Sequence, residues 1–173
     1  MSKNKPQSIA SLSGFPEWLP EQQIVEDQFV QRIREYYELA GFTPLRSRSV
    51  EPLDVLLSKG ETDKEIYVLK RIHADDDAKP AKFGLHFDLT VPFARFVTER
   101  EQSLVFPLKR YQIQSAWRGE RPQEGRYREF IQADADVVCR GNLPLQYDIE
   151  LPGMLVDILD GFPIPKVCVR VNN

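Results

Sequence analysis

The sequence predicts an α+β domain in which an antiparallel sheet is flanked by helices. Apolar residues recur at steps of three and four over residues 22–40, which is the spacing of an amphipathic helix. Residues 108–118 and 128–138 have a strand-like pattern and are joined by a polar segment with Pro122 and Gly125 as breakers. Helices placed around consecutive antiparallel strands are typical of the α+β class.

The N-terminal elements follow in order. Residues 1–13 are polar and predict a flexible tail, so residues 14–173 are expected to form the folded part. Residues 14–20 contain two prolines and predict an irregular stretch packed on the core. We expect the helix over residues 22–40 to end at Gly41 as a left-handed cap.

Apolar runs at residues 66–72 and 83–89 predict an antiparallel hairpin with a long polar connection. Thr90 is expected to be the N-cap of a helix that runs to about Arg100.

The C-terminal part of the chain predicts two more elements. Residues 148–159 have helical spacing, with Pro152 as a kink or a late start. Residues 166–171 alternate as a strand.

Composition limits the class of protein. At 173 residues, 42% apolar and 28% charged, the chain is long enough for one well-buried domain and short for two. A net charge of -3 gives no global positive field for nucleic acid. Cys139 and Cys168 lack zinc-site spacing, and we expect them to be inert in a reducing, cytoplasmic setting. No run approaches the ~20 apolar residues of a membrane helix, so membrane insertion is not expected.

The strand over residues 128–138 carries an unusual polar face. Side chains alternate along a strand, so Phe130, Gln132, Asp134 and Asp136 share one face. Burying such groups without partners costs about 1–3 kcal/mol each, so this face predicts the floor of a binding site. Arg118 stands at the end of the preceding strand, where its guanidinium suits a carboxylate or a phosphate.

A plainer interpretation is that this face is solvated. The loop arginines are then surface charges paired with Glu120, Glu124 and Glu129. The pattern alone leaves both interpretations open.

Residues 118–123 (RGERPQ) and 125–130 (GRYREF) resemble motif 2 of class II aminoacyl-tRNA synthetases, and they are most similar to the histidyl-tRNA synthetase family. Residues 85–95 resemble that family's substrate-binding strand and following helix, and the helix over residues 22–40 resembles its motif 1 helix. The resemblance implies the N-terminal part of a class II catalytic domain. Such a domain activates L-histidine with ATP and Mg²⁺ to histidyl-adenylate, transfers the histidyl group to tRNA(His), and is usually a homodimer.

The resemblance also implies site residues. Arg118 is the expected catalytic residue, bridging the histidine carboxylate and the α-phosphate of ATP. Glu120 is expected to help hold ATP, Arg126 or Arg128 to meet the outer phosphates, and Phe130 to stack on adenine. The implied histidine-binding residues are Asp88, Leu89, Thr90, Arg118, Gln132 and Asp136.

Within the implied histidine site, Asp88, Thr90 and Gln132 surround the α-ammonium, and Asp136 lies near the imidazole. A local role for Asp88 and Thr90 at the start of the helix is compatible with this.

No metal site is predicted from the protein's own residues. Asp75, Asp76 and Asp77 form a loop cluster that we expect to be solvated. His73 and His86 lack ligand partners at the required spacing and are expected to be structural or surface residues.

The sequence departs from the family pattern in two ways. Arg48 stands at the motif 1 proline position, although Glu51 matches the glutamate that follows it. The family's histidine-specific segment, motif 3 and anticodon-binding domain have no counterpart before Asn173, so we expect a partial core with little or no activity alone. Two alternatives remain: a histidine-binding regulatory paralogue of ATP phosphoribosyltransferase, and a non-catalytic dimerisation module.

Overall fold

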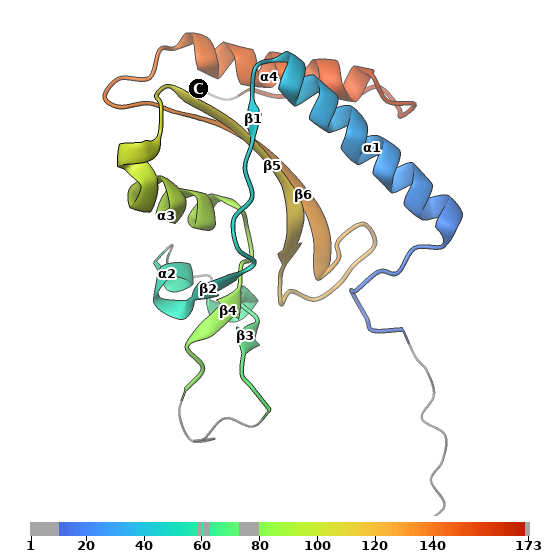
Figure 1. The fold of residues 1–173 in the computed structure, drawn as a ribbon. Coiled ribbons are helices and arrows are strands. Elements are labelled where there is room, and N and C mark those ends of the chain that lie inside the picture. Colours follow the sequence, from blue (N-terminus) through green and yellow to red (C-terminus); the bar gives the residue numbers. More distant parts are fainter. Residues whose placement is uncertain (1–10, 59, 61–62, 73–79, 172–173) are drawn as a thin grey trace, which may run out of the picture.

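A computed structural model describes residues 11–58, 60, 63–72 and 80–171. Its elements are α1 (Pro20–Leu39), β1 (Thr43–Pro44), β2 (Val50–Pro52), α2 (Leu53–Leu57), η1 (Asp63–Glu65), β3 (Val68–Leu69), β4 (Phe83–Leu85), α3 (Thr90–Arg100), η2 (Glu101–Ser103), β5 (Leu108–Trp117), β6 (Glu129–Val138) and α4 (Gln146–Asp160). The predicted α+β class is confirmed (Figure 1).

The main sheet is built around the long β5–β6 hairpin. The two strands pair antiparallel over their whole length, from Leu108 opposite Val138 to Trp117 opposite Glu129. The short β1 adds to the other edge of β5 in the parallel direction. The predicted strand, polar loop and strand unit is therefore confirmed.

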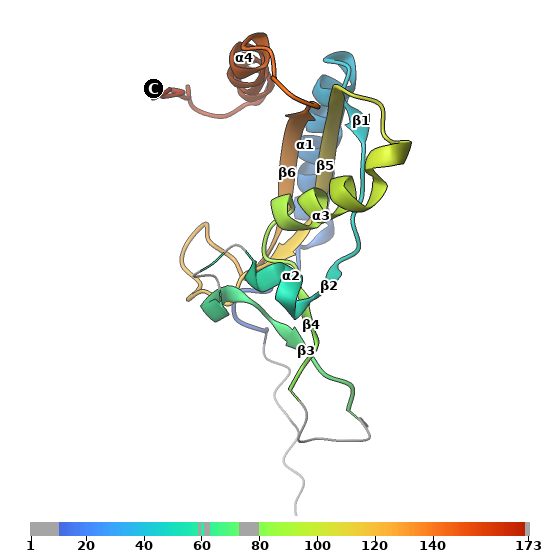
Figure 2. The same cartoon turned by 90° about the vertical axis from the view of Figure 1, so that its left-hand side faces the viewer.

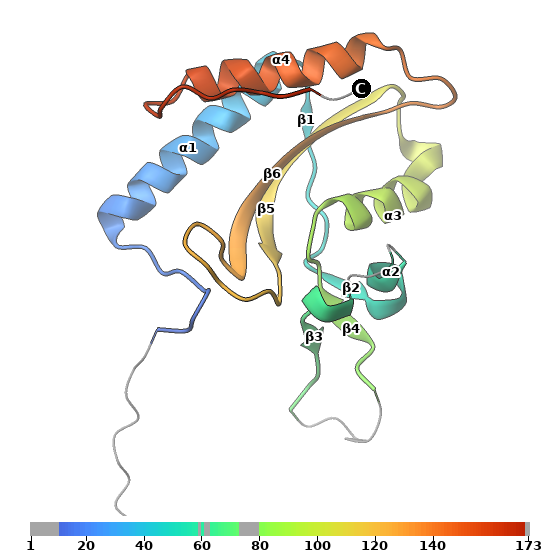
Figure 3. The same cartoon turned by 180° about the vertical axis from the view of Figure 1, so that it is seen from behind.

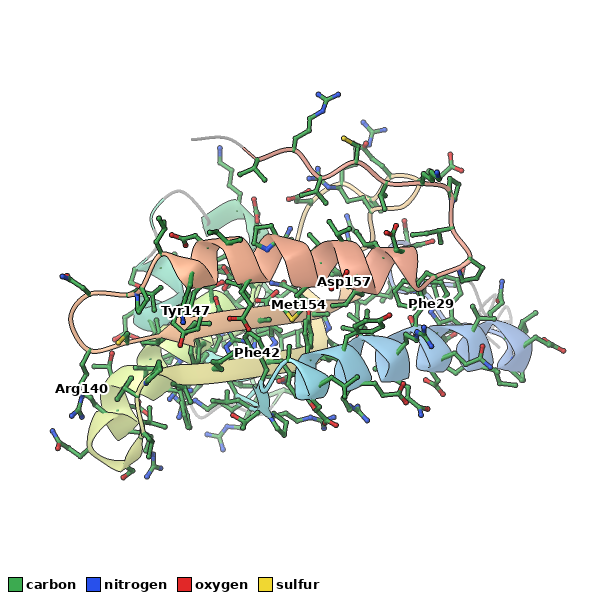
Figure 4. The ribbon with its side chains drawn as sticks, turned by 90° about the horizontal axis from the view of Figure 1, so that it is seen from above. Phe29, Phe42, Arg140, Tyr147, Met154 and Asp157 are labelled. Carbon is green, nitrogen blue, oxygen red and sulfur yellow. The ribbon has the colours of Figure 1, made fainter. Side chains whose placement is uncertain are left out.

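One face of this sheet is closed by helices. Tyr37, Phe42, Tyr111 and Ile158 form the buried cluster where α1, β5 and α4 meet. Seen from above, α1 and α4 lie next to each other, and Met154 of α4 packs against this cluster (Figure 4). The apolar faces of the two helices need an apolar surface to pack on. The side chains at odd-numbered positions of β5 and β6 form that surface.

The helix α3 lies on the opposite side of the β5–β6 hairpin from α1 (Figure 2). Below it, β4 pairs antiparallel with both β2 and β3 in a second small sheet. The predicted hairpin is thus present, although its strands are shorter than the apolar runs. Its connection over residues 73–79, with His73, Asp75, Asp76 and Asp77, lies outside the described residues.

The segment before α1 is tied to the loop between β5 and β6 (Figure 3). The Gly14 carbonyl oxygen accepts hydrogen bonds from the Arg128 and Glu129 amides at 2.7 and 3.1 Å. Phe15 packs edge-on against Tyr67 with 6.0 Å between ring centroids. The predicted irregular stretch on the core is confirmed, whereas residues 1–10 of the predicted tail lie outside the described residues.

Two local predictions are wrong. Residues 166–171 form no strand, because no neighbouring strand pairs with this exposed segment in the described part of the chain. Thr90 is not the cap of α3: the Asp88 carboxylate accepts a hydrogen bond from the Val91 amide at 3.1 Å, while Thr90 is the exposed first residue of the helix. A carboxylate two residues earlier in the chain therefore supplies the capping contact.

Two other local features agree with the pattern. Gly41 follows α1 with φ of 80°, the left-handed conformation expected of a C-terminal glycine. Pro152 lies inside α4. Within the described ranges, no helix has the length and apolar character to cross a membrane.

Candidate active site

The face of the β5–β6 hairpin away from α1 and α4 is polar. The antiparallel register places β5 side chains opposite β6 side chains in three polar pairs: Arg110 with Asp136, Gln112 with Asp134, and Gln114 with Gln132. The next pair toward the loop is Ala116 with Phe130. The register agrees with the face predicted for Phe130, Gln132, Asp134 and Asp136. In addition, β5 contributes the polar side chains opposite them, which the sequence interpretation had not used.

Arg118 and Phe130 lie together at the loop end of this face. The Arg118 Nε donates to the Phe87 carbonyl oxygen at 3.1 Å, which joins the end of β5 to the segment after β4. Its guanidinium carbon lies 5.0 Å from the centroid of the Phe130 ring. The terminal nitrogens of Arg118 make no hydrogen bond or ion pair within the described residues, so both remain to donate to an anion.

The three charged candidates in the loop have different surroundings. Arg126 is 61% exposed and forms an ion pair with Glu120 at 2.9 Å. Arg128 is half-buried, and its guanidinium donates to the carbonyl oxygens of Glu120 and Ser13. The Arg126 side chain is therefore held by a charge pair at the surface, whereas the Arg128 side chain fastens the N-terminal segment to the loop.

Asp88 and Leu89 are buried between β4 and α3, and Thr90 is exposed. Asp88 is 5% exposed, and its carboxylate holds the first turn of α3. The Arg118 contact with Phe87 brings this segment next to the Arg118–Phe130 pair. The structure thus brings together two groups of predicted residues that are about 30 positions apart in the chain.

Gln132 and Asp136 lie further along β6. The Gln132 amide nitrogen donates to both carboxylate oxygens of Asp134 at 3.0 Å. Asp136 forms an ion pair with Arg110, which is completely buried. From Phe130 to Asp136 the strand extends about 20 Å, so the candidate residues line an elongated site along the hairpin.

Electrostatics differ along this site. Burial raises the pKa of Asp136, and Asp134 adds to this, while the neighbouring Arg110 charge lowers the same pKa. Burial also lowers the pKa of Arg110, against the attraction of Asp136 and Asp134. The far end of the site therefore holds a strongly interacting cation and two carboxylates in a partly dry environment.

Sequence reasoning missed Arg110. The signal was available: Arg110, Gln112 and Gln114 alternate along β5 just as the predicted residues do along β6. His86, expected to be structural or at the surface, is completely buried. Its two ring nitrogens lie 3.2 and 2.7 Å from the carbonyl oxygens of Arg48 and Ser115, which makes it structural.

The motif 1 region contains a buried charge cluster. Glu51 has no exposed surface, and each of its oxygens accepts hydrogen bonds from a different arginine. The partners are Arg48 at 2.9 Å and Arg95 of α3 at 2.8 Å. Arg48 and Glu51, two positions singled out in the sequence, are thus in direct contact.

The described residues contain no group of three or more His, Cys, Asp or Glu side chains arranged to hold a metal ion. Cys139 is partly buried and Cys168 is exposed, and both are free thiols. The polar face therefore presents an arginine for anions, an aromatic ring for stacking and carboxylates for N–H donors.

The chain is also similar to known proteins. A family model described as "Histidyl-tRNA synthetase" matches residues 14–173. The chain is 55% identical over 163 residues to the histidine–tRNA ligase of Thermobifida fusca, covering 94% of this chain and 37% of that protein. The chain thus spans well under half the length of such relatives.

Solved structures give the same result. A crystal structure of histidyl-tRNA synthetase from Nostoc sp. PCC 7120 is 39% identical with a TM-score of 0.76, over 88% of this chain and 34% of that chain. A structure titled as an ATP phosphoribosyltransferase regulatory subunit/histidyl-tRNA synthetase, from Bacillus halodurans C, is 20% identical with a TM-score of 0.74. It covers 90% of this chain and 38% of that chain, and at this identity it shows the fold alone.

Proposed function

The chain belongs to the histidyl-tRNA synthetase family, and on this premise we propose that it is the N-terminal part of the catalytic domain of a histidine–tRNA ligase. The reaction joins L-histidine to the α-phosphate of ATP, supplied with Mg²⁺, and then passes the histidyl group to tRNA(His). The observation that carries the proposal is the placement of Arg118, held by Phe87, beside the Phe130 ring with its terminal nitrogens open.

The first step needs alignment more than acid or base catalysis. A histidine carboxylate is already an anion at neutral pH, and it must approach an α-phosphate that is also negative. An arginine that contacts both groups screens their repulsion and fixes the line of attack. As the carboxylate oxygen bonds to the α-phosphorus, pyrophosphate leaves, so the bond to the β-phosphate breaks.

The other residues bind and orient the substrates in this proposal. Phe130 stacks on adenine, and Arg126 moves from Glu120 to the outer phosphates of ATP. Asp88, Thr90 and Gln132 surround the α-ammonium of histidine with Leu89 beside them, and Asp136 accepts from the imidazole. The elongated polar face suits a substrate pair laid along the hairpin.

A second candidate is a histidine-binding regulatory role. The fold likeness to the Bacillus halodurans structure, whose title names an ATP phosphoribosyltransferase regulatory subunit, favours keeping it. Such a protein has no need of ATP, whereas the Arg118, Glu120 and Phe130 set suits ATP. Calorimetry with histidine, with and without ATP, separates the two candidates.

A chimera tests the catalytic proposal. Residues 14–173 replace the matching segment of the Thermobifida fusca ligase, and histidine-dependent exchange between ATP and pyrophosphate is measured. We expect exchange in the chimera, and a loss of at least about a hundredfold for R118A, the scale of removing one electrostatic stabiliser. The matched control is R121Q, an exposed loop arginine that should leave exchange unchanged. Normal exchange in R118A would remove Arg118 from its role.

A further inference from the structure

Arg110 is an unusual residue for the middle of a sheet. It has no exposed surface, yet its guanidinium remains charged in any protein environment. Its Nε and Nη1 have no hydrogen-bond partner within the described residues. A permanent buried charge needs an opposite charge nearby, and the ion pair with Asp136 provides it.

Phe93 fixes the plane of this guanidinium. The Arg110 guanidinium carbon lies 3.9 Å from the centroid of the Phe93 ring, which is close enough for stacking. Phe93 is in the first turns of α3, three residues after Thr90. Arg110 therefore links the Asp136 end of β6 to the helix that begins with the Asp88–Thr90 segment.

The carboxylates of Asp134 and Asp136 differ in whether an oxygen is available to a ligand. Both oxygens of Asp134 accept from the Gln132 amide. The Asp136 Oδ2 faces Arg110, whereas its Oδ1 makes no hydrogen bond within the described residues, and the side chain is 39% exposed. Asp136 is thus the carboxylate with an oxygen open to a ligand.

We propose that Arg110 is a positioning residue that orients Asp136 and keeps it ionised, so that Oδ1 accepts a hydrogen bond from a heteroaromatic N–H of the bound amino acid. The identity of that amino acid as histidine rests on the proposed function. The role of Arg110 rests on the buried ion pair and the Phe93 stack, and it can be measured without any substrate.

The charges around Asp136 give the sign of the effect. Arg110 of β5 favours the ionised form of Asp136, while Asp134 of β6 opposes it. Tyr37 of α1 interacts with Arg110 and with both carboxylates, and Phe93 of α3 contributes no charge. Removing the Arg110 charge leaves burial and Asp134 unopposed, so Asp136 should then hold its proton to higher pH.

The first experiment follows the Asp136 carboxyl carbon by NMR as a function of pH in the whole chain. R110M keeps the length of the side chain and its contact with Phe93 but removes the charge. We expect its Asp136 midpoint to move to higher pH, and R110K to move it back toward the wild-type value. An unchanged midpoint in R110M overturns the inference.

R140M is the matched control. Arg140 also lies over an aromatic ring, Phe106, and also pairs with a carboxylate, Glu101, but it is 55% exposed and outside the site. Figure 4 shows Arg140 at the end of the hairpin away from the Arg118 loop. Its replacement should leave the Asp136 midpoint unchanged, and an equal shift in R140M would overturn the assignment to Arg110.

A second variant covers failure of R110M to fold. In the wild-type chain the Arg110 Nε–Hε signal should change with pH at the Asp136 midpoint, and D136N should abolish that change. An Arg110 signal that titrates identically in D136N contradicts the pairing.

Ligand binding separates this inference from the proposed function. Histidine is titrated into the Thermobifida fusca chimera with and without R110M, and R110M should weaken its binding at least about tenfold while ATP binding is unchanged. An equal loss of ATP binding would overturn the positioning role. A shifted Asp136 midpoint in the chain with no histidine binding by the chimera contradicts the proposed function and supports the Arg110–Asp136 coupling.

Discussion

At the scale of single residues, Glu51 is the clearest case of a buried charge with all its contacts made. Arg48 and Arg95 each donate to one of its oxygens, and the carboxylate is completely buried. Removing the Glu51 charge leaves the largely buried Arg95 without its buried partner, which is costly. The cluster also joins β2 to α3, so its loss affects the packing of both.

We therefore expect E51Q to lower the free energy of unfolding by about 3 kcal/mol. The control is E99Q, which removes the other carboxylate bonded to Arg95 but is half-exposed, and it should cost less than about 1 kcal/mol. Urea denaturation of the two variants measures the difference. Equal small effects would show that the cluster contributes little to stability.

Arg126 and Arg128 are two residues apart, but their replacement should affect different properties, ATP binding for Arg126 and thermal stability for Arg128. R126Q removes an exposed charge and should weaken ATP binding about tenfold with an unchanged melting temperature. R128M breaks the contacts with Glu120 and Ser13 and should lower the melting temperature. Calorimetry with ATP and thermal unfolding give the two readouts, and reversed effects would exchange the assigned roles.

At the scale of elements, α1 is coupled to β6 through Tyr37. Its hydroxyl donates to the Ala133 carbonyl oxygen at 3.4 Å, and burial raises its pKa to about 12. The unfolded tyrosine ionises near pH 10, so above that pH the unfolded chain loses a proton that the folded chain keeps. This contribution is complete below pH 10 and disappears as pH rises through 12.

Stability should therefore fall between pH 10 and pH 12, and Y37F should fall less steeply over the same range because it has no hydroxyl to ionise. Denaturation of both proteins across this range measures the two slopes. The same slope in Y37F would assign the loss to other groups.

Two glycines at α4 offer a test of helix propensity. Gly153 lies inside the helix, is exposed, and has no atom within 4 Å of where a Cβ would stand. G153A should therefore stabilise the protein by about 0.5–1 kcal/mol. At Gly161 a Cβ would lie 3.1 Å from the Tyr36 hydroxyl, so G161A should give no such gain. Equal increases in melting temperature for G153A and G161A would contradict the packing of α4 on α1.

The long helices and strands were predicted correctly because they are long enough to show a period. The alternation in β6 identified its polar face because each face has a different environment, one against α1 and α4 and one against the site. β1 and β2, with two and three residues, are too short for any period to appear.

The failures also have physical causes. Residues 166–171 have the composition of a strand, but pairing depends on a partner that composition does not reveal. Asp and Thr are both residue types that favour helix caps, and only the backbone direction decides that Asp88 and not Thr90 accepts from the Val91 amide. The link between Arg110 and Asp136 likewise required the register of the two strands.

At the scale of the whole molecule, one face of the β5–β6 hairpin is covered by helices and the other is partly exposed to solvent. Helices α1 and α4 close one face with the buried cluster (Figure 1). The other face carries Arg118, Phe130 and the Asp136 region, and several of its polar side chains remain partly exposed. An adenylate formed on a surface that is open to water is poorly protected from hydrolysis, and its charges are screened.

We therefore expect the 173-residue chain to bind ATP or histidine weakly and to show no measurable histidine-dependent exchange between ATP and pyrophosphate. The chain covers 37% of the length of the Thermobifida fusca ligase, so most of that protein's residues have no counterpart here. The chimera with the same residues should be active and serves as the positive control. Exchange by the 173-residue chain at a rate near that of the chimera would show that this one sheet face suffices for activation.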